Sequence, residues 1–162
     1  MAINLLLVDD HEVVRSGLRM LLENEADLKI VGEANNGGQA LELAERLKPD
    51  VVIMDITLPD ISGIDATRRI KKLFPEMAVV ALTIHEDQQY FFEMLQAGAS
   101  GYVPKRAAPD DLITAIRAAM VSWSPLRYTN ATFPPRASRS RYACFSAEHA
   151  STALAPRLPI AA

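Results

Sequence analysis

The stretch that decides the fold is VVIMDITLPDISG at residues 51–63. Its four apolar residues are typical of a strand covered on both faces, and they lead directly into the carboxylate of Asp55. The stretch LLLVDD at residues 5–10 has the same form and ends in two carboxylates, Asp9 and Asp10. Both stretches predict a buried strand whose carboxyl end carries acidic side chains.

Short apolar runs alternate with helical patterns as far as about residue 121. The runs predict strands at 3–9, 28–34, 50–55, 77–83 and 100–104. Helical spacing, with Pro and Gly at the boundaries, predicts helices at 12–23, 37–47, 64–74, 87–97 and 109–121. Strands that alternate with helices imply an α/β fold, in which a doubly wound parallel sheet is covered on both faces by right-handed crossovers.

The composition is that of a soluble globular protein. The chain has 162 residues, of which 49% are hydrophobic and 23% are charged. No apolar run approaches the roughly 18–20 residues of a membrane span, and no basic flank precedes the first apolar run as in a secretory signal. The single cysteine, Cys144, has no internal disulfide partner. We therefore expect a cytoplasmic protein without a membrane partner.

Polar side chains follow four of the predicted strands. They are Asp9, Asp10, Asp55, Thr83 and Lys105. Taken singly, such residues are more often helix caps, strand residues or solvated lysines. Taken together, they converge, because the carboxyl ends of parallel strands meet at one edge of the sheet.

The expected cluster predicts phosphoryl chemistry. Three close carboxylates repel one another, and a hard divalent cation relieves that repulsion. Oxygen ligands with no Cys or His nearby favour Mg2+. A carboxylate nucleophile beside Mg2+, a lysine and a hydroxyl indicates an aspartyl phosphate.

Four motifs resemble the receiver domain of bacterial two-component response regulators. They are VDDH at 8–11, MDITLPDISG at 54–63, LT at 82–83 and GYVPK at 101–105. The resemblance covers about residues 1–121. LLLVDDHEVVRSGLRMLL together with AGASGYVPKRA is most similar to the subfamily that carries LuxR-type helix-turn-helix effectors. The resemblance implies a flavodoxin-like or CheY-like sheet of five strands in the order 2-1-3-4-5.

The resemblance also implies roles for the acidic residues. Asp55 would be the phosphoacceptor. Asp10, Asp55 and the backbone carbonyl of Thr57 would bind Mg2+ directly, and Asp9 would act through water. The protein would then be a signalling switch rather than a turnover enzyme.

Further roles follow from the same resemblance. Lys105 would pair with the phosphoryl group, Thr83 would move toward it, and Tyr102 would turn inward behind Thr83. Thr57 and His85 would modulate the lifetime of the phosphoryl group. The donor would be a sensor histidine kinase, and the face formed by helix 87–97, strand 101–104 and the last helix is a candidate homodimer interface.

Residues 122–162 differ in composition from the rest of the chain. They hold five of the ten prolines, five arginines, one glutamate and no lysine or glycine, whereas residues 1–121 carry 12 basic and 19 acidic residues. No helical or alternating period is present, so we expect a tail of low order rather than a DNA-binding effector domain. The tail is interpreted as out-of-frame translation or sequence introduced by cloning, with a natural extension as the alternative.

Three other functions compete with the receiver interpretation. A Mg2+-dependent phosphatase with an Asp nucleophile would need a second acid two residues later, where this chain has Thr57. A phosphate-independent interaction module on the same fold would not need the intact set of polar residues. A dinucleotide-binding protein would need a G-x-G-x-x-G after the first strand, and none is present.

Overall fold

The computed structural model describes residues 2–84 and 87–122, in which five strands alternate with five helices. The strands are β1 (Ile3–Val8), β2 (Leu28–Ala34), β3 (Val51–Asp55), β4 (Ala78–Thr83) and β5 (Gly101–Pro104). The helices are α1 (Glu12–Leu22), α2 (Gly37–Leu47), α3 (Gly63–Leu73), α4 (Gln88–Gln96) and α5 (Pro109–Ser122). Of the tail predicted at 122–162, only Ser122 is described, as the last residue of α5; residues 123–162 and His85 lie outside the described residues.

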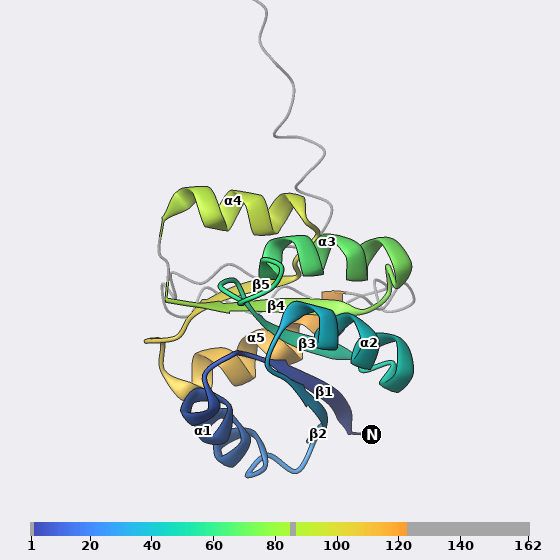
Figure 1. Ribbon diagram of the computed structural model, residues 1–162. Helices are drawn as coiled ribbons and strands as arrows, with labels where there is room; N and C mark the ends of the chain where they lie inside the picture. The colour runs from blue at the N-terminus through green and yellow to red at the C-terminus, as the bar shows by residue number, and fades with distance from the viewer. Residues whose placement is uncertain (1, 85–86, 123–162) are drawn as a thin grey trace, which may run out of the picture.

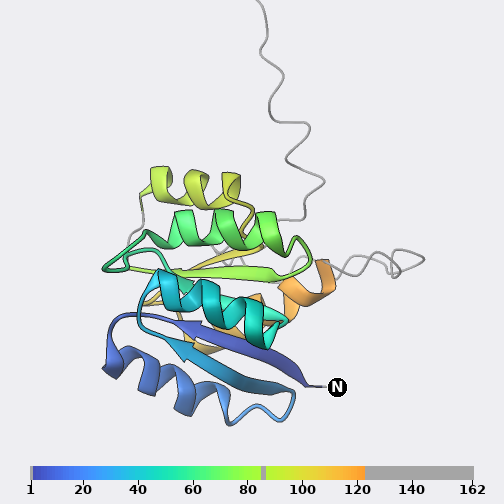
Figure 2. The same cartoon turned by 45° about the vertical axis from the view of Figure 1, so that its right-hand side comes forward.

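The strands form one parallel sheet in the order β2-β1-β3-β4-β5, which confirms the predicted topology (Figure 1). Helices α1 and α5 cover one face of the sheet, and α2, α3 and α4 cover the other (Figure 2). None of the helices in the described part of the chain is long and apolar enough to cross a membrane.

Burial on both faces explains why the central strands lack polar alternation. In β1, Leu5 and Leu7 pack in the core beneath α1 and α5, whereas Leu6 and Val8 pack in the core beneath α2 and α3. Every residue of β3 and β4 is buried. The hydrophobic layer therefore ends only where the strands end, and the polar side chains begin there.

Gly63 holds the loop after β3 against the strand. Its backbone N–H donates to the carbonyl of Ile56 at 2.8 Å. A Cβ atom at this position would lie 1.9 Å from the carbonyl oxygen of Asp55 and 2.9 Å from the Cα atom of Ile56. Both neighbours are backbone atoms, so the loop has to move to accept any side chain.

We expect Gly63→Ala to lower the free energy of unfolding by roughly 1–3 kcal/mol, the usual cost of overpacking. Urea denaturation measures the change. Gly17→Ala is the matched control, because Gly17 lies in α1 and a Cβ there would have no atom within 4 Å. Alanine in a helix should be neutral or stabilising. Equal unfolding free energies for Gly63→Ala and the wild type would contradict the close approach.

Candidate functional site

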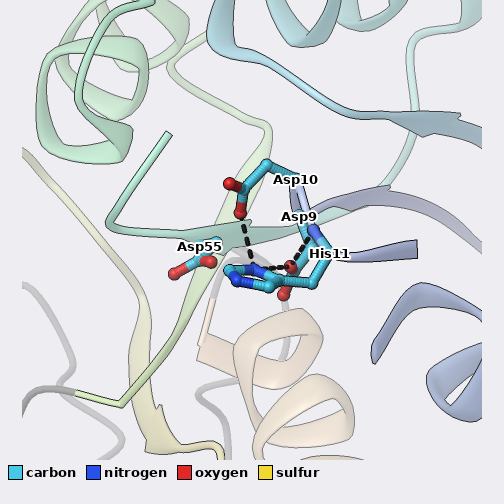
Figure 3. Close-up of side chains that lie close together, drawn as sticks. All are labelled: Asp9, Asp10, His11 and Asp55. Carbon is cyan, nitrogen blue, oxygen red and sulfur yellow. Dashed lines mark hydrogen bonds and ion pairs between the residues drawn. The ribbon is translucent and has the colours of Figure 1, made fainter. Parts of the chain in front are cut away.

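Carboxylates from two adjacent strands meet at the carboxyl edge of the sheet. Asp9 follows the last residue of β1, and Asp55 ends β3. These two residues are 1% and 2% exposed, whereas the side chain of Asp10 is 32% exposed at the rim. One ligand atom from each of Asp9, Asp10, His11 and Asp55 lies within 4.8 Å of the others (Figure 3). The structure therefore brings together acidic residues that are 45 or more positions apart in the sequence.

A single lysine joins the two buried carboxylates. The Nζ atom of Lys105 lies 2.6 Å from Oδ2 of Asp9 and 2.6 Å from Oδ2 of Asp55. Its side chain is only 13% exposed. The backbone N–H of Lys105 donates to the carbonyl of Thr83 at 2.7 Å, which fixes the residue directly after β5. The ammonium group is therefore held inside the acidic cluster and not in solvent.

Burial has a large effect on the pKa values of both Asp55 and Lys105. Burial raises the pKa of Asp55, and the neighbouring charge of Asp9 raises it further, against the opposing effect of Lys105. Burial also opposes the charge on Lys105, but hydrogen bonds to Asp55 and Asp9 outweigh it and raise the lysine pKa. One lysine thus compensates only part of the negative charge of the carboxylates at this edge of the sheet.

The other predicted residues lie around Asp55. The backbone N–H of Thr57 donates to Oδ1 of Asp55 at 3.3 Å. Thr83 is fully buried at the end of β4, one residue beyond the register partner of Asp55. Tyr102 in β5 is half-buried, and its ring meets Phe91 of α4 edge-on with centroids 5.4 Å apart. The tyrosine therefore links the strand next to the cluster with α4.

The expectation that no histidine lies near the carboxylates is wrong. The Nδ1 atom of His11 lies 2.7 Å from Oδ1 of Asp10 and 3.2 Å from Oδ1 of Asp9. The backbone N–H of His11 also donates to Oδ1 of Asp9 at 2.9 Å, and this turn folds the imidazole back over the acidic residues (Figure 3). The signal in the sequence was the adjacency within VDDH, which strand-end reasoning did not use.

The donor set fits a hard divalent cation. The cluster holds three carboxylates and one ammonium group, so a cation of charge +2 would balance it. The oxygen atoms of Asp9, Asp10 and Asp55 are the ligands that Mg2+ prefers. His11 adds one nitrogen donor at the exposed side of the cluster without changing its oxygen-rich character.

Asp60 anchors the loop that follows Asp55, and sequence reasoning missed it. Its carboxylate accepts hydrogen bonds from the backbone N–H groups of Gly37 and Gly38, each at 2.7 Å. These bonds lower the pKa of Asp60. Because the two N–H groups open α2, the acid lies where the helix dipole favours negative charge. The loop that carries Thr57 is thereby tied to a second helix.

Residues 5–117 match the family of the response regulator receiver domain. The response regulator UvrY of Escherichia coli strain K12 is 44% identical over 115 residues, which are 71% of this chain and 53% of UvrY. A LuxR-family two-component response regulator from Aurantimonas sp. SI85-9A1 superposes with a TM-score of 0.72 at 38% identity, covering 75% of this chain and 86% of the other.

A third comparison is with a solved receiver-domain structure. It is the isolated REC domain of RcsB from Salmonella enterica serovar Typhimurium, in the presence of the phosphomimetic BeF3−, with a TM-score of 0.69 and 29% identity. The superposition covers 73% of this chain and 88% of the RcsB domain.

The fold and the acidic edge define a receiver domain, and the chain belongs to the response regulator receiver family. Its similarity to UvrY and to the Aurantimonas protein supports the LuxR-type subfamily. The chain spans about half the length of the curated relatives that it matches.

Proposed function

We propose that this chain is a phosphorelay switch in which Asp55 accepts a phosphoryl group from the histidine of a sensor kinase. The observation that carries the proposal is the position of Lys105, whose Nζ lies 2.6 Å from both Asp55 and Asp9 inside the acidic cluster. A carboxylate that is buried, nucleophilic and adjacent to a fixed cation is suited to form an acyl phosphate.

The transfer is a displacement at phosphorus. A carboxylate oxygen of Asp55 forms a bond to phosphorus, the bond between phosphorus and the kinase imidazole breaks, and its electron pair returns to the imidazole. Asp10, Asp55 and the carbonyl of Thr57 would hold Mg2+, with Asp9 acting through water, and the bound ion supplies charge compensation for the phosphoryl oxygens. Lys105 then pairs with a phosphoryl oxygen.

Phosphorylation adds charge at the edge where β4 and β5 end. The hydroxyl of Thr83 turns toward the new group, and Tyr102 follows it inward. Because Tyr102 contacts Phe91, this change reaches the face formed by α4, β5 and α5. A homodimer through this face is the proposed response.

The proposed output is regulation of transcription in the cytoplasm, as in the LuxR-type family. The proposed receiver comprises residues 1–121, although α5 runs one residue further to Ser122, and the tail predicted from the sequence is proposed to lie outside the receiver. DNA binding belongs to an effector domain and not to the receiver.

Incubation with Mg2+ and acetyl phosphate tests the proposal. We expect one phosphoryl group per chain, located at Asp55 by mass spectrometry, followed by slow decay once the donor is removed. Omission of Mg2+ should abolish the labelling. Continuous release of phosphate would instead indicate a phosphatase, and absence of label with Mg2+ present would indicate a phosphate-independent module.

A further inference from the structure

Arg15 reaches back from the first turns of α1 to the end of β1. Its Nη1 atom donates to the backbone carbonyl of Asp9 at 2.7 Å. The Arg15 side chain is only 16% exposed. A mostly buried guanidinium group thus satisfies the carbonyl that directly precedes the N–H of Asp10.

The sheet edge holds this guanidinium group in place. Its Nε atom lies 3.5 Å from Oε2 of Glu33 in β2, and the other carboxylate oxygen of Glu33 pairs with Arg19, one turn further along α1. The N–H of Asp9 donates to the carbonyl of Ala34 at 3.1 Å. The backbone of Asp9 is therefore held on both sides, by β2 through its N–H and by Arg15 through its carbonyl.

The orientation of this peptide group determines where two neighbouring carboxylates point. Asp9 is 1% exposed and faces Lys105, whereas Asp10 is 32% exposed and faces His11. The carbonyl that Arg15 binds belongs to the peptide that joins them. A rotation of that peptide would move both carboxylates, and hard-cation sites depend on the orientation of their ligands.

We propose that Arg15 is a positioning residue for the Mg2+ site, acting through the peptide group between Asp9 and Asp10. This inference rests on the proposed function, because it takes that acidic cluster as the metal site. Loss of a partner that orients a metal ligand typically weakens metal binding on the order of tenfold or more. Arg15 touches no metal ligand atom of the cluster, so its effect is on geometry.

Isothermal titration with MgCl2 alone tests the inference on the full chain. Arg15→Met keeps the apolar stem and removes the donor, and we expect Mg2+ binding to weaken on the order of tenfold. Arg19→Met is the matched control: it removes the other partner of Glu33 and leaves the Asp9 carbonyl bond intact, so binding should stay within about twofold. Arg15→Gln, whose side chain is too short to reach the carbonyl, should behave like Arg15→Met.

Two further readouts separate positioning from a structural role. The amide chemical shifts of Asp10 should move in Arg15→Met and stay in place in Arg19→Met. Labelling by acetyl phosphate should need more Mg2+ in Arg15→Met but reach the wild-type rate at saturating Mg2+. Thermal melts show which variants are folded at the assay temperature, and Arg15→Gln replaces Arg15→Met if the latter is not.

Three outcomes overturn the inference. Wild-type affinity for Mg2+ in the folded Arg15 variant would show that the carbonyl bond is irrelevant to the site. Equal losses in Arg15→Met and Arg19→Met would assign the effect to the Glu33 ion pair. A wild-type chain that binds no Mg2+ would overturn both this inference and the proposed function, whereas the first two outcomes leave the proposed function standing.

Discussion

Asp55→Asn is expected to reduce phosphoryl incorporation to background and, in metal-free buffer, to raise the midpoint temperature of unfolding. The first effect follows from the loss of the nucleophilic carboxylate. The second follows from burial, because Asp55 is 2% exposed and shares one lysine with Asp9. A neutral amide of the same shape fills the position without that electrostatic cost.

The pH dependence of this stabilisation follows from the pKa of Asp55. Burial raises that pKa above the ordinary value of 3.8. Because the folded state binds this proton more tightly, protonated Asp55 adds to the free energy of unfolding at a pH below the unfolded-state pKa. That added stability is lost as the pH rises through the folded-state pKa and the buried carboxyl ionises. The advantage of Asp55→Asn should therefore be present at neutral pH and shrink as the pH falls toward 3.8.

Calorimetry and radiolabelling measure the two effects in the same preparation. Asp110→Asn is the control, because Asp110 is an exposed residue in the first turn of α5 and is not one of the clustered carboxylates. It should label like the wild type. Full labelling of Asp55→Asn would place the phosphoacceptor elsewhere, and a lowered midpoint temperature would show that the ionised carboxylate stabilises the fold.

The sequence predicted the fold because each local pattern agreed with the sheet. Unbroken apolar runs indicated strands covered on both faces, and the structure buries every residue of β3 and β4. The structure adds a local cap at the start of α3, where Ser62 accepts a hydrogen bond from the N–H of Asp65. The sequence also predicted that Asp9, Asp55 and Lys105 lie close together. That prediction depends only on topology, because the carboxyl ends of parallel strands meet at one edge of the sheet.

Contacts that depend on side-chain direction were not predictable in the same way. His11 and Arg15 both fold back over the end of β1, and the sequence gives only their offsets from Asp9. Asp60 accepts a hydrogen bond from Gly37, which lies 23 positions earlier in the sequence. Helix and strand periodicity describe neighbouring residues only and do not predict such a contact. Val13 of α1 is apolar, yet the structure leaves it 85% exposed. These features depend on tertiary geometry rather than on local pattern.

Lys105→Met is expected to lower the free energy of unfolding by about 3–5 kcal/mol at neutral pH in the absence of Mg2+, the usual result of removing one partner from a buried ion pair. The Nζ atom is the cation within 2.6 Å of both Asp9 and Asp55, which are almost fully buried. Methionine keeps the length of the side chain, so the change isolates the charge. Both carboxylates would then remain buried with little compensation.

The pH range in which Lys105 stabilises the fold follows from the pKa of its ammonium group. Contacts with Asp55 and Asp9 outweigh burial and raise the pKa of Lys105 above 10.5. The stability that its charge contributes is therefore complete below 10.5 and is lost as the pH rises through the higher folded-state value. The difference in the free energy of unfolding between the wild type and Lys105→Met should stay constant from neutral pH upward and narrow only in strongly alkaline solution.

Urea denaturation of a double-mutant cycle separates charge from packing. Adding Asp55→Asn to Lys105→Met should recover a large part of the lost stability, because only one buried carboxylate then lacks its partner. Mg2+ should likewise stabilise the single variant more than the wild type, since a bound cation replaces the missing charge. Lys72→Met is the control, because Lys72 is exposed on α3. If Lys105→Met were no less stable than this control, the buried carboxylates would not depend on the ammonium group, and the electrostatic account of the site would be wrong.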